Sequence, residues 1–269
     1  MPLPLTQLPL YLSNFLPVSY DSTDAKPRLP THHGFLDWDC ADAISVPAMQ
    51  VALEHIRATG TFPVGTRPSV FQSARTDHGC LPPPRSPKQT TKRTFQTNVD
   101  SKEDQNSVGK CPVSDAKIEE MKAKVADWVQ QGRPGHRLFN EGQLQLCLFD
   151  GFLIYSQEMK HIMKLIDIKL FLLVSREKAT KRREARDGYV TLEGFWKDPP
   201  GYVDQIVWPN YAEEHAWLFK DGNVEGVLDK DVLDKAGISA QLGQGLDIDM
   251  ETSLEWAVDL IIRELEKMA

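Results

Sequence analysis

Two short, almost continuously apolar runs constrain the fold of this chain more than any other feature. They are LQLCLF at residues 144–149 and IDIKLFLLV at residues 166–174. Apolar runs of this length, without an alternating polar face, are typical of parallel strands buried on both faces. Segments with helical periodicity separate and flank them, so we predict an α/β fold with a parallel sheet and helices on both faces.

Three segments carry helical periodicity together with helix-end signals. Gly60 suits the C-terminus of the first helix, and Ser114 can cap the N-terminus of the second. The third helix is amphipathic and is expected to be capped by Thr252 or Ser253. The three segments are residues 41–60, residues 115–129 and the C-terminal segment from residue 252 to residue 265.

Composition excludes several classes of protein. The chain is 41% hydrophobic and 26% charged, which is typical of a globular protein rather than of a disordered or fibrous one. It lacks an uninterrupted apolar run of 18 residues, so we expect no membrane-spanning helix. The net charge of −7 argues against a nucleic-acid partner. The four cysteines show no CxxC or Cys/His spacing, so we expect neither zinc nor disulfides, but a reduced cytoplasmic protein.

Two segments differ from the rest of the chain. Residues 1–20 are apolar, but they lack a basic start and contain four prolines, so we expect an ill-structured N-terminal segment rather than a secretory signal. Residues 64–98 contain six basic side chains, one acidic side chain and five prolines, which predicts a disordered basic insertion. The remaining residues, 21–63 and 99–269, are expected to form a single α/β domain.

Charged residues follow both apolar runs, where parallel strands present their carboxyl ends to ligands. Asp150 comes directly after the first run, and can either contact Mg²⁺ and a hydroxyl nucleophile or begin an Asp-Gly turn. After the second run, Lys178, Arg182 and Arg186 share one helix face, with Arg183 beside it. These cations form either a solvated helix face or a lid over nucleotide phosphates.

Aromatic residues near carboxylates provide a second indication of a ligand. In Trp38-Asp39, an indole that can stack on a ring adjoins a carboxylate that can accept hydrogen bonds from ribose hydroxyls. A stretch at residues 188–211 is rich in aromatic residues, glycine and proline. That stretch is either a small satellite core or a stacking surface.

Five longer stretches together resemble the fungal nicotinamide riboside kinases, within the uridine-kinase-like P-loop kinases. The resemblance covers residues 34–63 and 99–269 and is most specific in DPPGYVDQIVWPNY, residues 198–211. It implies a three-layer sandwich and the ATP- and Mg²⁺-dependent phosphorylation of the 5′-hydroxyl of nicotinamide riboside. The product of that reaction is nicotinamide mononucleotide, for NAD synthesis. The segment DPPGYVDQIVWPNY belongs to the longest of the five stretches, KATKRREARDGYVTLEGFWKDPPGYVDQIVWPNYAEEHAWLF, and the others are GFLDWDCADAISVPAM, DSKEDQNSVGKCPVSDAKIEE, LFDGFLIYS and ETSLEWAVDLIIRELEKM.

The resemblance also implies roles for particular residues on the substrate side. Trp38 matches the aromatic residue that stacks on nicotinamide, and Asp39 matches the acid that holds the ribose hydroxyls. Arg183 matches an arginine that also reaches the ribose. Tyr189 is the candidate for a second ring on the nicotinamide, with a one-residue uncertainty in register beside Gly188.

On the phosphate side, the resemblance implies four further roles. Arg182 and Arg186 match lid arginines near the ATP phosphates. Asp150 stands where the family has an acid close to Mg²⁺ and the reacting groups. Asp21 falls near the second acid of a paired-Asp strand end and is the candidate catalytic base.

One departure from the family is large. Its members begin with a strand and a phosphate-binding loop GxxxxGK[ST], but here the only Gly-Lys, Gly109-Lys110, precedes Cys111 and has Asp104 in place of the first glycine. We therefore expect the first strand and the loop to be missing, and with them the backbone and lysine contacts to phosphate. Three alternatives stay open: a nicotinamide riboside kinase, a uridine or other nucleoside kinase, or an inactive protein that binds a nucleoside or a partner.

Overall fold

A computed structural model describes most of the predicted domain. The described residues are 10–13, 30–61, 63, 71–73, 111–142, 144–185, 189–191 and 194–268. The predicted irregular segments 1–20 and 64–98 lie outside them, apart from two short strands, Leu10–Ser13 and Phe71–Ser73, and Pro63 just before the second segment. Within the described residues, no helix is long and apolar enough to cross a membrane.

Both predicted apolar runs contribute a strand with a parallel neighbour. In the first run β5 (Cys147–Asp150) pairs in parallel with β1 (Leu10–Ser13), and β4 (Phe71–Ser73) pairs with β1 in the antiparallel direction. In the second run β6 (Lys169–Phe171) pairs in parallel with β9 (Ile238–Ala240). The fold is therefore α/β with short parallel pairings, and a strand occupies the place beside β5 although we expected the family's first strand to be missing.

Burial on both faces, which the apolar runs predicted, is incomplete. In β5, Cys147 and Phe149 pack against the core, but Leu148 between them is 54% exposed. Leu172, which directly follows β6, is also exposed. The apolar residues at these strands therefore alternate between a covered side and an exposed side.

One side of β5 is covered by α1 (Val46–Thr59) and α4 (Lys160–Met163). Met49, Leu53 and Ile56 of α1 form one buried cluster with Ile162 of α4. The helical segment predicted at residues 41–60 is divided, because a 3₁₀ turn at Ala41–Ala43 precedes α1, which has a proline in its first turn. Gly60 ends the helix in the left-handed conformation, as predicted.

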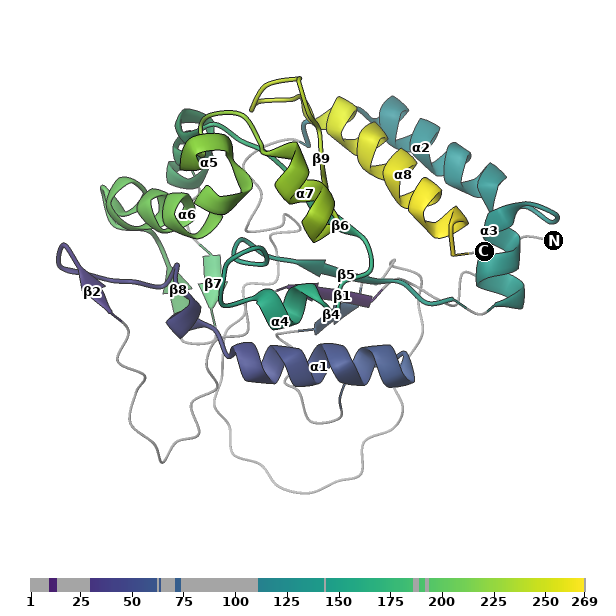
Figure 1. Cartoon of the computed structure of the whole chain (residues 1–269), viewed down its shortest axis with the longest axis horizontal. Helices are drawn as coiled ribbons and strands as arrows, with labels where there is room; N and C mark the ends of the chain where they lie inside the picture. The colour runs from purple at the N-terminus through teal and green to yellow at the C-terminus, as the bar shows by residue number, and fades with distance from the viewer. Residues whose placement is uncertain are drawn as a thin grey trace, which may run out of the picture.

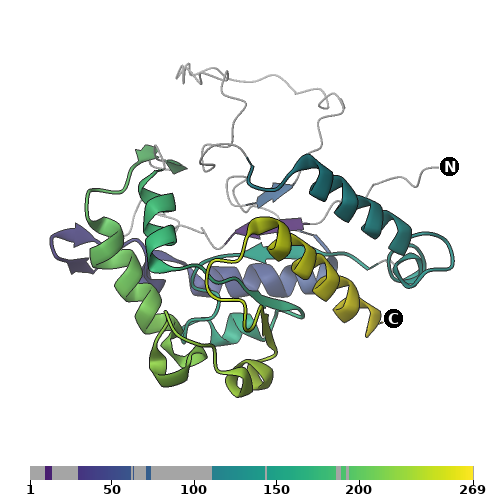
Figure 2. The same ribbon diagram turned by 90° about the horizontal axis from the view of Figure 1, so that it is seen from above.

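The opposite side carries α2 (Asp115–Trp128) and α8 (Met250–Glu266), which lie side by side above the strands (Figure 1). The view from above shows α8 crossing over β5 with α1 beyond it (Figure 2). Trp128 and Leu265 share a buried cluster with Leu138, which lies in a π-helical turn (Arg137–Glu141) after α3 (Pro134–His136). These helices therefore enclose the strands from the second side.

Two helix starts test the predicted caps. Ser114 accepts a hydrogen bond from the Lys117 N–H and begins α2, as predicted. The predicted Thr252/Ser253 cap of the C-terminal helix is wrong, because Asp249 accepts the hydrogen bond from the Thr252 N–H and α8 begins at Met250. A carboxylate three residues earlier provides a better cap than a hydroxyl inside the first turn.

The third cluster joins β6 and β9 to the helices that follow the basic segment. Residues 203–211, the end of the stretch rich in aromatic residues, glycine and proline, lie in a π-helical turn (Val203–Val207) and in α6 (Trp208–His215). His215 is buried and stacks on Phe171 of β6, and burial lowers its pKa, so it is a neutral core residue. The remaining elements of this region are α7 (Lys230–Ala236) and two 3₁₀ turns (Ala216–Leu218 and Lys220–Gly222).

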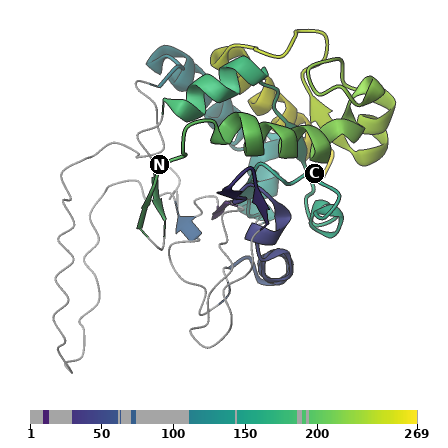
Figure 3. The same cartoon turned by 90° about the vertical axis from the view of Figure 1, so that its left-hand side faces the viewer.

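One end of the molecule is built from small elements. The basic helix α5 (Arg176–Glu184) lies near α6, and two hairpins lie beside them (Figure 3). The first hairpin pairs β2 (Thr31–His32) with β3 (Phe35–Leu36), and the second pairs β7 (Tyr189–Thr191) with β8 (Gly194–Trp196). The candidate site lies at this end.

Candidate functional site

The site begins at the segment Asp37-Trp38-Asp39, between β3 and the 3₁₀ turn at Ala41. Both aspartates are buried, with 2% and 4% exposure, and Trp38 is half-buried. A buried carboxylate is costly unless charges or hydrogen bonds compensate it. The surroundings of the two aspartates therefore determine what the segment can do.

Arg183, near the end of α5, provides the compensating charge for Asp39. Its Nη1 lies 2.6 Å from Asp39 Oδ1, and its Nη2 lies 2.9 Å from Asp39 Oδ2. On its other side, the Nε lies 2.6 Å from Asp198 Oδ2. Burial acts to lower the pKa of Arg183, but the hydrogen bonds and charges of Asp39 and Asp198 outweigh it and raise the pKa. The guanidinium thus carries a fixed positive charge between two carboxylates.

Tyr202, which precedes the π-helical turn, connects Arg183 to the Trp38 backbone. Its hydroxyl oxygen accepts a hydrogen bond from the Trp38 N–H at 2.9 Å, and its ring lies 5.8 Å from the Arg183 guanidinium carbon. Burial, followed by the charge of Asp39, raises the pKa of Tyr202, so the hydroxyl stays protonated. The ring of Phe35 packs edge-on against Tyr202.

Asn210 of α6 compensates the other aspartate. Its Nδ2 donates to Asp37 Oδ1 at 3.0 Å and Oδ2 at 2.8 Å, and also to the Asp39 carbonyl at 3.1 Å. Asp37 Oδ1 accepts a further bond from the Asp39 N–H at 2.9 Å. Both buried carboxylates in the segment therefore have partners from distant elements.

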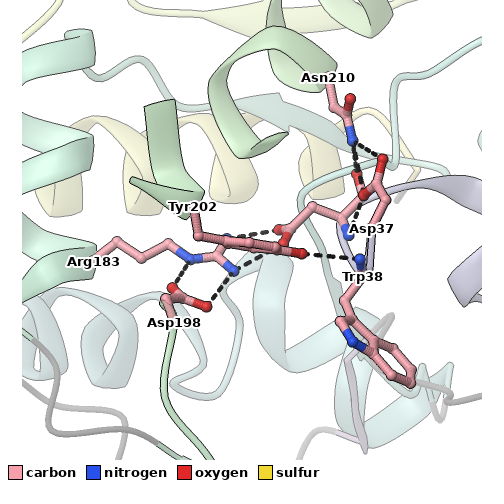
Figure 4. Close-up of polar contacts among 7 residues, drawn as sticks. Asp37, Trp38, Arg183, Asp198, Tyr202 and Asn210 are labelled. Carbon is pink, nitrogen blue, oxygen red and sulfur yellow. Dashed lines mark hydrogen bonds and ion pairs between the residues drawn. The ribbon is translucent and has the colours of Figure 1, made fainter. Parts of the chain in front are cut away.

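The side chains divide into a polar part and an aromatic part. Figure 4 shows the guanidinium and its carboxylates on one side, with the Trp38 indole pointing away from them. Each Asp39 oxygen accepts one hydrogen bond from Arg183, and a carboxylate can accept about four hydrogen bonds in all. Arg183 keeps a small exposed edge, with 17% of its side chain accessible. The exposed edge of Arg183 can therefore reach a diol, whereas Asp39, with 5% of its side chain accessible, presents only a small part of its surface to one.

The structure brings together three of the predicted site residues, Trp38, Asp39 and Arg183. Arg182, the neighbour of Arg183 in α5, acts on a different carboxylate. The pKa of Asp247 is lowered mainly by hydrogen bonds from Ser175, and the positive charges of Lys178 and Arg182 lower it further. The group formed by Trp38, Asp39 and Arg183 therefore does not include Arg182.

Two of the other predicted residues belong to strands. Asp150 is the last residue of β5 rather than the first residue after the strand, and it is exposed. Tyr189 is the first residue of β7, opposite Trp196 in the register. Asp21 and Arg186 lie outside the described residues.

Four residues of this network were not assigned from the sequence: Asp37, Asp198, Tyr202 and Asn210. Three of them belong to DPPGYVDQIVWPNY, the most specific part of the family resemblance. That stretch therefore contained the signal, because Tyr202 and Asn210 contact the Asp37–Asp39 segment and Asp198 contacts Arg183. Among the described residues, no group of three or more His, Cys, Asp or Glu side chains is arranged to hold a metal ion.

Comparison with known proteins gives a consistent set of relatives. A nicotinamide riboside kinase of Schizosaccharomyces pombe is 30% identical over 245 residues, covering 91% of this chain and 82% of that protein. The enzyme of the same name from Saccharomyces cerevisiae is 41% identical over 90 residues, 34% of this chain and 37% of that protein. That of Eremothecium gossypii is 28% identical over 217 residues, 78% of this chain and 70% of that protein. No family model and no solved structure matches the chain.

Proposed function

Because the chain belongs to the nicotinamide riboside kinase family, we propose that it binds nicotinamide riboside and phosphorylates its ribose 5′-hydroxyl with ATP. The product is nicotinamide mononucleotide, which serves NAD synthesis. The observation that carries the proposal is the two-point ion pair between Arg183 and Asp39, the residue that follows Trp38 in the sequence. The pair provides polar partners for a ribose, and the indole provides an aromatic surface for the ring attached to it.

The ribose half of the substrate fits the polar part of the site. The vicinal hydroxyls donate to the free acceptor positions of Asp39, and one hydroxyl oxygen accepts from the remaining Nη1–H of Arg183. Asp198 supports this arrangement, because it holds the Nε and limits rotation of the guanidinium. Charge-assisted hydrogen bonds of this type are stronger than neutral ones and favour a substrate with both hydroxyls.

The nicotinamide half fits the aromatic part. Its pyridinium ring is positively charged in the riboside, and an indole face attracts cations as well as flat rings. Trp38 points away from the ion pair, so that a nucleoside can place its ribose on the pair and its base on the indole (Figure 4). We propose Tyr189 as the second ring, as the resemblance implies.

The phosphate donor is assigned to the carboxyl end of β5. We propose a P-loop-kinase sandwich in which Asp150 at this end contacts the reacting groups, with Arg182 and Arg186 near the ATP phosphates. Transfer forms a bond between O5′ and the γ-phosphorus, breaks the bond from that phosphorus to the bridging oxygen, and passes the hydroxyl proton to a carboxylate. Asp21 is the candidate for that carboxylate.

Mg²⁺ accompanies ATP in this proposal as part of the co-substrate. Within the part of the chain that the structure describes, no group of three or more His, Cys, Asp or Glu side chains is arranged to hold a resident metal ion. The printed sequence also contains no GxxxxGK[ST]. We therefore assign no step to a metal ion, and the affinity for ATP becomes the measurement that decides between kinase and nucleoside-binding protein.

Calorimetry of the full chain with nicotinamide riboside and with ATP, titrated separately, tests the proposal. Binding of both, with turnover of labelled ATP to nicotinamide mononucleotide, supports a kinase. Binding of the riboside without ATP binding or turnover contradicts phosphotransfer and identifies a nucleoside-binding protein. Uridine provides the comparison, because tighter binding of uridine contradicts the assigned substrate.

A further inference from the structure

Asn210 lies behind the segment that holds the substrate-binding acid, and its amide nitrogen contacts that segment at three atoms. Two are the Asp37 carboxylate oxygens and the third is the Asp39 carbonyl oxygen. Because an amide has two N–H groups, one can be shared by the Asp37 carboxylate while the other serves the carbonyl. A single side chain of α6 thus fixes both ends of the segment.

The contact is built into the fold rather than lying on the surface. Asp37 is only 2% exposed, and its oxygens are turned toward Asn210 and the Asp39 N–H. A carboxylate this deep in the protein destabilises the fold unless such donors are present. The Asn210 amide therefore has a specific, charge-assisted partner.

A second contact fixes the middle of the same segment. The Trp38 N–H donates to the Tyr202 hydroxyl, and Tyr202 lies eight positions before Asn210 in the sequence. Side chains hold three backbone groups of this segment by hydrogen bonds. These groups are the Trp38 N–H, the Asp39 N–H and the Asp39 carbonyl. The Asp39 side chain starts from this fixed backbone and meets Arg183 on the other side.

We propose that Asn210 and Asp37 form a positioning pair that sets the direction of the Asp39 carboxylate and thereby the preference for ribose over 2′-deoxyribose. The inference rests on the proposed function, because it takes Asp39 as the acid that binds the ribose. Neither residue touches the substrate in this proposal. Moving a positioned group by roughly 1 Å costs on the order of 100-fold in reaction rate.

Calorimetry with nicotinamide riboside and its 2′-deoxy analogue tests the pair, using the full chain. Asn210→Ala should weaken riboside binding roughly 10- to 100-fold, because the Asp39 carboxylate is no longer directed at the diol. The deoxy analogue lacks one of those hydroxyls, so the substitution should weaken its binding much less. The ratio of the two dissociation constants should therefore fall toward one. Asn223→Ala is the matched control, since the exposed Asn223 side chain accepts a local hydrogen bond from the Glu225 N–H.

A conservative variant separates positioning from simple loss of structure. Asp37→Asn keeps an oxygen that can accept from Asn210 and from the Asp39 N–H, so riboside affinity should fall less than in Asp37→Ala. Asn210→Asp removes the donor and places a second carboxylate against Asp37. The loss of riboside affinity should therefore be largest in this variant. An equal loss for riboside and deoxy analogue in Asn210→Ala overturns the positioning role.

Amide hydrogen exchange provides a readout that needs no ligand. In Asn210→Ala, peptides covering residues 37–39 should exchange faster while peptides from α1 and α8 stay as in the wild type. Unchanged exchange at residues 37–39, or faster exchange throughout the chain, overturns the inference. If the wild type does not bind the riboside, the proposed function fails and the exchange measurement alone decides whether the pair holds the segment.

Discussion

Arg183 and Asp39 lie 144 positions apart in the sequence, and their side chains meet at two points, Nη1 with Oδ1 and Nη2 with Oδ2. The planar guanidinium matches the geometry of the carboxylate, so this pairing fixes orientation as well as charge. Asp198 on the far side keeps the guanidinium from rotating. The ribose site therefore depends on α5 being held against the segment that follows β3.

Asp39→Ala should weaken nicotinamide riboside binding by about 1.5–3 kcal/mol, because charge-assisted hydrogen bonds to the ribose hydroxyls are lost. Calorimetry on the full chain measures this change. Asp42→Ala is the matched control, since Asp42 lies three positions further on with an exposed side chain. A dissociation constant unchanged by Asp39→Ala removes Asp39 from the proposed role.

Arg183→Lys should reduce both riboside affinity and stability, although it keeps the positive charge. A lysine ammonium cannot contact Asp39 at two points and Asp198 at the same time. We expect the free energy of unfolding to fall by about 1–3 kcal/mol, the cost of unmade hydrogen bonds to buried charges. Urea titration monitored by circular dichroism measures the stability.

Arg57→Lys is the control for that substitution. Arg57 also pairs with an aspartate, Asp167, at 2.6 Å, but both side chains of this pair are exposed, and such surface pairs contribute about 0–1 kcal/mol. Equal losses in the two variants would show that burial of the Arg183 pair has no special effect.

Trp38→Ala should cost about 1–3 kcal/mol of riboside binding, the range for a ring stacked on an aromatic side chain. Trp38→Phe should recover part of this loss, because it keeps an aromatic face. Both variants retain the backbone N–H that Tyr202 accepts, so the segment itself should stay in place. If alanine and phenylalanine at this position bind the riboside equally, the stacking role is wrong.

Glu214 should make stability depend on pH. Burial, followed by a hydrogen bond and repulsion from Glu158, raises the pKa of Glu214 from its ordinary value of 4.5 to about 7. The folded state therefore holds a proton that the unfolded state releases, and this stabilisation is complete below about pH 4.5 and is lost as the pH rises through about 7.

Thermal unfolding of the wild type and of Glu214→Gln from pH 4 to pH 8 measures the effect. The glutamine stays neutral at every pH, whereas the wild type loses stability as Glu214 ionises. The melting temperature of the variant should therefore rise relative to that of the wild type as the pH increases. Glu225→Gln, which alters an exposed side chain, should leave the wild-type pH profile unchanged. Parallel profiles for Glu214→Gln and the wild type would contradict the raised pKa.

Local sequence patterns determined much of the secondary structure. The two apolar runs contain β6 and all of β5 except Asp150, and the Ser114 cap and Gly60 stop mark helix ends in the structure. These features were predictable because capping and left-handed glycine depend on neighbouring residues alone. The helices in residues 203–215 were not predicted, because Gly201 and Pro209 suggest a loop, although a proline is tolerated in the first turn of α6.

The candidate site was determined by the sequence only in part. Family resemblance assigned Trp38, Asp39 and Arg183, and the structure places them together. The partnership of Asp37 with Asn210, 173 positions away, could not be predicted, because burial of a carboxylate depends on which distant donor packs against it. Composition and periodicity fix which segments become helices and strands, whereas only the packing of α5 and α6 against the Asp37–Asp39 segment decides which charges are buried and how they pair.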